Sequence, residues 1–136
     1  MQFFTIKVKG KPKPQQRHRH TKAGFTYDPS SQYKKDFIAQ AMAQAPKLPL
    51  KGIISLRAIF KMPYVKKHYR TGKFAGQLKP NPPIEYIIKP DIDNLIKFVL
   101  DAGNKILWHD DSQVYKVEME KIYCEEPCTL LEIMEE

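Results

Sequence analysis

One amphipathic segment, residues 92–106, most constrains the fold of this chain. On a helical wheel at about 100° per residue, its apolar and charged side chains separate onto opposite faces. The apolar face consists of Ile92, Leu95, Ile96, Val99, Leu100, Ala102 and Ile106. The polar face consists of Asp93, Asn94, Lys97, Asp101 and Lys105. Pro90 favours a helix start just after it, and Gly103 offers a stop. The pattern predicts a helix that buries one face and exposes a row of charges.

The flanking segments predict a sheet on which this helix can pack. Residues 3–8 and 52–62 alternate apolar and polar side chains, as half-buried strands do. Residues 31–45 repeat apolar side chains at helical spacing after the start signal Asp28-Pro29-Ser30. Residues 113–134 read as two strands joined by the turn EEPC. We therefore expect one α+β domain over residues 1–136: a small mixed sheet of about four strands with two main helices, in the order strand, helix, strand, helix, hairpin.

Two proline-containing basic stretches, residues 10–27 and 63–90, lack periodicity and are predicted to be long loops. In the second, aromatic side chains alternate with basic ones, a composition that suits phosphate attraction and base stacking. The candidate DNA-binding residues in these loops are Lys11, Lys13, Arg17, Arg19, Lys66, Lys67, Arg70 and Lys73. The alternative is that each loop is only a solubilising, flexible segment.

The charge of the chain is distributed unevenly. Residues 1–80 contain eighteen Lys and Arg against two Asp, a net charge of +16, whereas residues 81–136 contain five Lys against thirteen acids, a net charge of −8. A basic half joined to an acidic half suggests one surface for a polyanion and another for cations. The N-terminus lacks the features of a signal peptide, and no apolar run is long enough to span a membrane, so we expect a cytoplasmic protein without a membrane partner.

The acidic half carries an unusual group of aspartates. Asp91, Asp93, Asp101, Asp110 and Asp111 are five of the seven in the chain. Like charges this close destabilise the fold unless cations or hydrogen bonds compensate them. Simple structural roles are available, because Asp91 could be an N-cap and Asp93, Lys97 and Asp101 could form ordinary i, i+4 pairs.

Asp110 and Asp111 favour a different role for the group. The helix would extend about 16 Å to Gly103, at about 1.5 Å per residue. Residues 104–110 can span about 23 Å when extended, so the chain can return and set the second aspartate pair beside the first. Carboxylates from two segments at a helix entrance suit Mg²⁺, and Lys97 could face a phosphate oxygen. That arrangement suits phosphodiester hydrolysis.

These residues also resemble a known family. The motif P-D-I-D-N-L-I-K at residues 90–97, followed by Asp101 and W-H-D-D-S-Q-V at residues 108–114, resembles the RusA family of Holliday junction resolvases. The resemblance implies a RusA-like fold with metal-binding Asp91, Asp93 and Asp111, and with Lys97 as a fourth catalytic residue. It also implies a Mg²⁺-dependent homodimer, with Mn²⁺ as a candidate substitute, that nicks four-way junction DNA in recombination and repair.

One departure leaves the substrate open. In shorter members of the family the second strand runs almost directly into the aspartate motif, whereas residues 63–90 intervene here. The leading hypothesis is a junction endonuclease. A nuclease that prefers flaps or other branched DNA is an alternative, as is a DNA-binding module without catalysis. Retention of all four matched residues argues against the last, because a binding module gains nothing from anions near phosphate.

Overall fold

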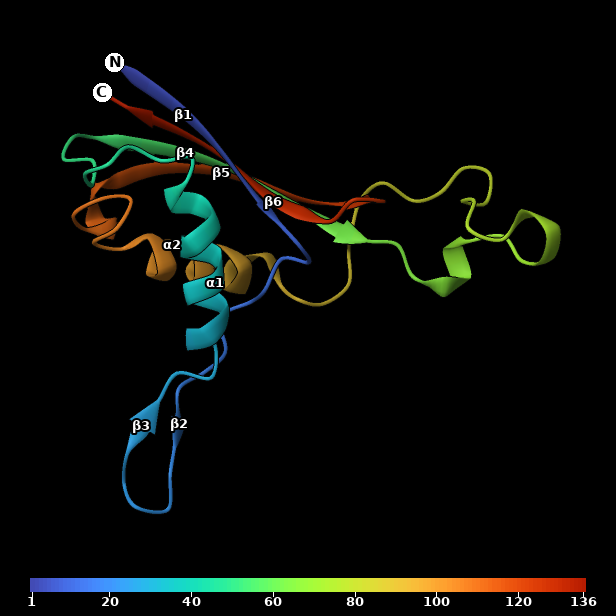
Figure 1. The fold of residues 1–136 in the computed structure, drawn as a ribbon, viewed down its shortest axis with the longest axis horizontal. Helices are drawn as coiled ribbons and strands as arrows, with labels where there is room; N and C mark the ends of the chain where they lie inside the picture. The colour runs from blue at the N-terminus through green and yellow to red at the C-terminus, as the bar shows by residue number, and fades with distance from the viewer.

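The computed structural model describes residues 1–136, which form a sheet with both helices on one face (Figure 1). The main strands are β1 (Gln2–Lys9), β4 (Ile54–Pro63), β5 (Val114–Cys124) and β6 (Cys128–Glu135), and the helices are α1 (Ser31–Met42) and α2 (Ile92–Gly103). The sheet order is β1-β6-β4-β5, with β4 and β5 parallel and the other neighbours antiparallel. This mixed four-stranded sheet with two helices confirms the predicted α+β class and the order of strands and helices along the chain. The predicted hairpin of the last two strands is wrong, because β4 lies between β5 and β6 and pairs with both.

The core lies between the sheet and the helices. In β4 the alternating side chains Ile54, Leu56, Ala58, Phe60 and Met62 are all buried, as the period-two pattern predicts. The apolar face of α2 covers them, with Leu95 and Val99 almost inaccessible to solvent. The two helices meet through Phe37 and Phe98, whose ring centroids are 5.7 Å apart in an edge-to-face arrangement. Residues 92–103 are thereby fixed with their charged face outward.

Gln40 of α1 and Gln44, just beyond the end of this helix, cover the free edge of β1. Gln44 accepts a hydrogen bond from the Lys7 N–H at 2.9 Å and donates one to the Lys7 carbonyl at 2.8 Å. Gln40 does the same for Lys9, at 2.9 and 3.3 Å. A side-chain amide presents the same donor and acceptor as a neighbouring strand, so it satisfies the peptide groups that an edge leaves unpaired. These four bonds fix α1 relative to the sheet.

α2 ends at Gly103, where a bulky side chain occupies the space beside the backbone. Trp108 is completely buried, and a Cβ added at Gly103 would lie 2.8 Å from Trp108 Cζ2. The backbone of Gly103 is helical, so the glycine is required by this close approach and not by a left-handed conformation. The chain then turns back through residues 104–110 towards β5.

Two segments project from the body in different directions (Figure 1). The first is the arm, residues 10–27, which ends in a hairpin of β2 (Arg19–His20) and β3 (Thr26–Tyr27). The sequence predicts only a loop here, because strands of two residues are too short to show alternation. The second is the excursion, residues 63–90, which contains two short 3₁₀ turns, η1 (Lys66–His68) and η2 (Gly72–Phe74). No helix in the chain has the length and apolar character needed to cross a membrane.

Candidate functional site

The entrance of α2 holds two exposed carboxylates with no local structural role. Asp91 is the N-cap residue by position, with extended backbone angles, but its side chain makes no capping hydrogen bond. Asp93 lies in the first turn and is also exposed. Lys121 fixes the chain just before them, donating from Nζ to the carbonyls of Ile88 and Pro90 at 2.9 and 2.8 Å. The N-cap interpretation of Asp91 therefore does not account for its carboxylate.

The interpretation of Lys97 as a surface ion-pair partner is not realised either. No carboxylate lies within 4.0 Å of its Nζ, and Asp93 also takes part in no ion pair. Asp101 pairs instead with Lys34 of α1, at 3.7 Å. Asp93 and Lys97 lie one turn apart on the exposed face of α2 and remain free to contact another molecule.

The base of the arm lies beside this face and forms a polar cleft with it. The N–H of Gln15 donates to the carbonyl of Asn94 at 2.8 Å, which attaches the arm to the first turn of α2. The cleft has a volume of about 610 Å³ and no hydrophobic lining. Its lining residues are Gln15, Gln16, Arg17, Arg19, Asp93, Asn94 and Lys97. The structure thus brings two of the predicted catalytic residues together with two of the predicted DNA-binding residues, although 74 or more positions separate them along the chain.

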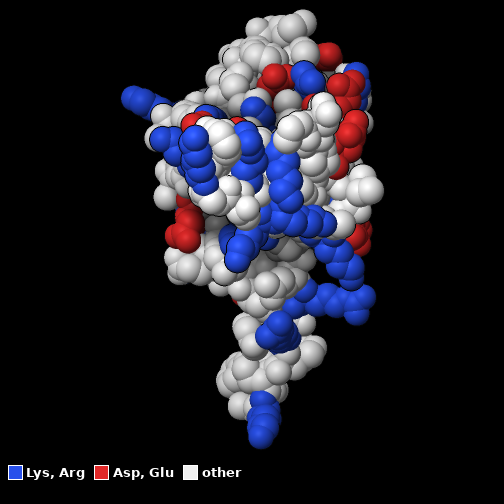
Figure 2. Space-filling model, turned by 90° about the vertical axis from the view of Figure 1, so that its right-hand side faces the viewer, with Lys and Arg blue, Asp and Glu red and all other residues white.

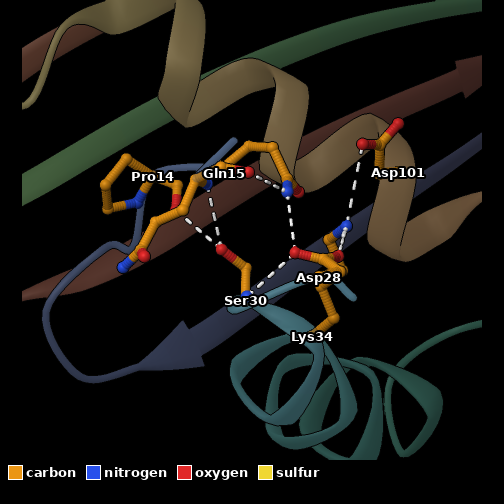
Figure 3. Close-up of polar contacts among 7 residues, drawn as sticks. Pro14, Gln15, Asp28, Ser30, Lys34 and Asp101 are labelled. Carbon is orange, nitrogen blue, oxygen red and sulfur yellow. Dashed lines mark hydrogen bonds and ion pairs between the residues drawn. The ribbon is translucent and has the colours of Figure 1, made fainter. Parts of the chain in front are cut away.

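Asp28 attaches the base of the arm to both helices (Figure 3). Its carboxylate accepts hydrogen bonds from Gln15 Nε2 at 2.9 Å, from the Ser30 N–H at 2.9 Å and from Lys34 Nζ at 2.6 Å. Lys34 also reaches Asp101 of α2. Burial raises the pKa of Asp28, but the bonds from Lys34, Ser30 and Gln15 outweigh it, so the net pKa lies below its usual value.

Ser30 completes this attachment. Its hydroxyl is buried, accepts from the Gln16 N–H at 3.0 Å and donates to the Pro14 carbonyl at 3.4 Å (Figure 3). Sequence reasoning reads Asp28 and Ser30 only as helix-start residues and misses this role, since the partners are 13 to 16 residues away. Aspartate and serine at a helix start are the available signal, because such side chains bond to nearby backbone groups.

The returning loop takes Asp111 to the C-terminal end of α2. The Asp111 N–H donates to Asn104 Oδ1 at 3.1 Å, and Asp110 caps the turn η3 (Asp111–Gln113) by accepting from the Ser112 N–H at 2.9 Å. Burial raises the pKa of Asp111, and the neighbouring carboxylates of Asp110 and Asp101 raise it further. The bond from Ser112 lowers the pKa of Asp110. Asp110 therefore has a local structural role, and Asp111 lies in a crowded acidic environment.

The predicted metal ligands are not gathered into one set of three. No group of three or more His, Cys, Asp and Glu side chains in residues 1–136 could hold a metal ion. The entrance pair, Asp91 and Asp93, nevertheless fits magnesium, because Mg²⁺ is commonly bound by one or two carboxylates together with substrate phosphate oxygens and water. Neither carboxylate is engaged in an ion pair or a cap. Asp111 as a further ligand stays a prediction.

The remaining predicted DNA-binding residues fall into two places. Lys11 and Lys13 line a groove of about 240 Å³ at the base of the arm, which also includes Pro90 and so adjoins the α2 entrance. Lys66, Lys67, Arg70 and Lys73 lie on the excursion, outside the cleft. Figure 2, viewed from the excursion side, shows Lys and Arg side chains across the middle of this face and along the arm, with Asp and Glu mainly at its margins. A basic face of this kind attracts nucleic acid.

Comparison with known proteins gives two findings. The family model described as endodeoxyribonuclease RusA matches residues 9–134, nearly the whole chain. The chain is also 34% identical over 107 residues to the uncharacterized protein YqaN of Bacillus subtilis (strain 168), an alignment that covers 74% of this chain and 71% of that protein.

Proposed function

Because this chain belongs to the RusA endodeoxyribonuclease family, we propose that it is a Mg²⁺-dependent endonuclease that resolves four-way DNA junctions during recombination and repair. The observation that best supports this proposal is the polar cleft, where Asp93 and Lys97 of α2 face Arg17 and Arg19 of the arm. Cations that bind phosphate beside a carboxylate that can hold a metal form the combination that phosphodiester hydrolysis needs.

The arginines of the arm are assigned to substrate binding. A guanidinium presents several N–H donors in a plane and can bind a phosphate through two parallel hydrogen bonds. Arg17 and Arg19 are exposed and have no carboxylate partner, so both are free to contact DNA. Their attachment through Gln15 to α2 sets the position of the bound phosphate relative to Asp93 and Lys97.

Asp91 and Asp93 are assigned to metal binding, with phosphate oxygens and water completing the coordination. A magnesium ion held there would polarise the phosphate and lower the pKa of an attacking water. Lys97, one turn along the helix and free of ion pairs, is assigned to stabilising the negative charge that develops on the phosphate oxygens. Asp111 is proposed as a further ligand on the family resemblance.

A homodimer is part of the proposal. A four-way junction has an approximate two-fold axis, and an isologous dimer would present two equivalent clefts to two opposed strands. Cutting two opposed strands requires two clefts. Each chain offers one cleft with one set of Asp93, Lys97 and arm arginines, so two chains are needed. Sedimentation equilibrium of the DNA-free protein measures the assembly directly.

The proposal is tested with labelled four-way, flap and linear duplex DNA, incubated with Mg²⁺, with Mn²⁺ and with EDTA. We expect paired nicks in the four-way junction, strict dependence on the metal and lower activity on the other substrates. Asp91→Asn, Asp93→Asn and Asp111→Asn should nearly abolish cleavage while leaving junction binding equal or tighter, because each removes a negative charge near phosphate. Asp110→Asn is the matched control and should matter less, since Asp110 caps a turn.

Three outcomes would contradict the proposal. Preferred cleavage of flaps would assign the chain to a different branched-DNA specificity. Binding without cleavage under every metal condition would indicate a DNA-binding module. Full activity in the Asp91→Asn or Asp93→Asn variant would remove the entrance pair from the active site.

A further inference from the structure

The excursion is anchored to the sheet by stacked aromatic rings. Tyr64 stacks on Tyr123 of β5 with centroids 4.9 Å apart and planes 12° apart, and Tyr86 lies against Tyr123 at 4.8 Å. The Tyr86 N–H donates to the Lys121 carbonyl at 3.1 Å, and the Tyr123 N–H to the Ile84 carbonyl at 2.8 Å. The two ends of the excursion are therefore held on the end of β5, and its base is a packed part of the domain.

The two legs of the excursion are also bonded to each other along its length. Tyr64 donates from its hydroxyl to the Pro83 carbonyl at 2.9 Å. Further out, the Lys79 N–H donates to the His68 carbonyl at 2.9 Å, and the Arg70 N–H to the Gln77 carbonyl at 2.7 Å. These cross-links define a rigid stalk, because each pins one leg against the other. The sequence, with its prolines and glycines, predicts only irregular structure here.

The far end of the stalk, residues 66–79, is a basic head. Its cationic side chains are Lys66, Lys67, Arg70, Lys73 and Lys79. Residues 63–84 contain no Asp or Glu, and none of these five cations forms an ion pair. Five unopposed charges on a rigid projection repel one another, so the arrangement costs stability unless an anion binds it.

Phe74 organises two of these charges. The Arg70 guanidinium carbon lies 4.0 Å from the centroid of the Phe74 ring, and Lys73 Nζ lies 5.6 Å from it. Both distances are within the range of a cation–π interaction. Since a guanidinium already covers the ring, Phe74 is poorly placed to stack on a base. Its contribution is to hold Arg70 and Lys73 in a defined position, which lowers the entropic cost of binding phosphate.

The head and the cleft lie on different parts of the molecule (Figure 1). The excursion leaves the body in a different direction from the arm, whose arginines line the cleft (Figure 1). The head residues take no part in the cleft lining. A DNA segment held in the cleft therefore reaches the head only if the DNA continues beyond the cleaved phosphate.

We propose that residues 66–79 form a preorganised head that binds the phosphate backbone of a duplex arm outside the cleaved site, with Phe74 as the residue that positions Arg70 and Lys73. The inference rests on the proposed function for the identity of the DNA as a branched substrate. The head would be a second DNA-binding surface, and it would make the affinity for a junction depend on the length of the duplex arms.

The test compares junction affinity over a series of arm lengths from about 6 to about 25 base pairs, roughly 20 to 85 Å at about 3.4 Å per base pair. Fluorescence anisotropy is measured in EDTA at several salt concentrations. The head variant is Arg70→Gln/Lys73→Gln. The control for net charge is Lys47→Gln/Lys51→Gln, which removes two exposed lysines between α1 and β4, away from the head and the cleft. Circular dichroism melting checks that both variants fold.

We expect the head variant to weaken binding to long arms by about tenfold. It should also reduce the salt slope by about 2, roughly one unit for each phosphate that the variant no longer neutralises. The difference in affinity between the head variant and the wild type should disappear for junctions with the shortest arms. The control should lower affinity slightly and equally at every length. Phe74→Ala should weaken long-arm binding about threefold at unchanged net charge, and Phe74→Leu should not rescue it, because an aliphatic side chain offers no cation–π interaction.

An equal deficit at every arm length in the head variant would overturn the proposal. A loss of single-strand affinity in Phe74→Ala with duplex affinity unchanged would do the same, since it would indicate base stacking. The outcome is separable from the nuclease assignment. If the head variant loses affinity only for long arms and the wild-type protein cleaves no DNA, the binding role of the head is supported and the proposed nuclease activity is contradicted. If the wild-type protein cleaves junctions and the head variant shows no loss of affinity that depends on arm length, the nuclease activity is supported and the head proposal is contradicted.

Discussion

Removing the charge of Asp28 should loosen the arm, because this carboxylate joins the arm to α1 and, through Lys34, to α2. Asp28→Asn keeps one side-chain oxygen, which can still accept from Ser30 and Gln15. It replaces the oxygen that faces Lys34 Nζ at 2.6 Å with an NH₂ group. The substitution therefore deletes one charge-assisted hydrogen bond and leaves a mostly buried ammonium group facing a donor.

The magnitude follows from the exposure of the pair. The side chains of Asp28 and Lys34 are 18% and 17% exposed, so their attraction is only partly screened by water. Hydrogen bonds to charged groups contribute about 1.5–3 kcal/mol. We expect Asp28→Asn to lower the free energy of unfolding by about 2 kcal/mol, and Asp28→Ala, which deletes all three bonds, by about 3–4 kcal/mol. At roughly 3–4 °C per kcal/mol for a chain of this size, the melting temperature should fall by about 6–8 °C in Asp28→Asn.

The pH dependence has a definite sign. Because the pKa of Asp28 is lowered in the folded protein, its contribution is present at neutral pH and is lost as the pH falls from about 3.9 through the lowered folded-state value. Urea denaturation of the wild type and Asp28→Asn between about pH 3 and 7 should give a difference that is constant at neutral pH and shrinks at acid pH.

A matched control is available on α1, the helix that follows Asp28. Asp36 is exposed and accepts one surface hydrogen bond from Gln32 at 3.1 Å, so Asp36→Asn should change the free energy of unfolding by less than about 0.5 kcal/mol. An effect of Asp28→Asn within that same range would contradict a stabilising role of the Asp28 carboxylate. Additive effects of Asp28→Asn and Lys34→Met in the double mutant would also contradict it, because groups that share a bond should not be independent.

Three further predictions concern α2 and the sheet edge. Lys97→Ala should slow single-turnover cleavage at saturating Mg²⁺ by about 10²-fold, while junction affinity and melting temperature barely change. Lys97→Arg should restore cleavage only partly, because it keeps the charge but changes the geometry of the head group. Cleavage by Lys97→Ala at close to the wild-type rate would show that Lys97 is only a surface residue. Gly103→Ala should lower the free energy of unfolding by about 1–3 kcal/mol, because the added Cβ would lie 2.8 Å from the Trp108 side chain. An unchanged midpoint in urea denaturation would contradict this close approach. Gln40→Ala/Gln44→Ala should speed hydrogen exchange of the β1 amides that these side chains cover, and unchanged exchange would show that the cap contributes nothing.

The sequence by itself determined the parts that local periodicity encodes. Alternation in residues 54–62 specified which face of β4 is buried, and the spacing of Leu95 and Val99 specified the buried face of α2. Because each pattern repeats within one element, no distant residue is needed to read it. The same logic placed Asp93 and Lys97 on one exposed face, and the motif around them identified the family over residues 9–134.

Only the tertiary structure decided which distant residues meet that face. The contacts of Gln15 with Asn94 and Asp28, and of Lys34 with Asp101, join segments that no local pattern connects. The sequence predicts that residues 104–110 set Asp111 beside Asp91 and Asp93, but Asn104 holds Asp111 at the C-terminal end of α2 instead. The length of this loop limits only how far the chain can reach, and the contact with Asn104 decides where it ends. Side-chain hydrogen bonds between separate elements depend on packing that is complete only when the whole sheet has formed. The composition of the cleft therefore follows from the fold as a whole, whereas its helix face follows from a dozen consecutive residues.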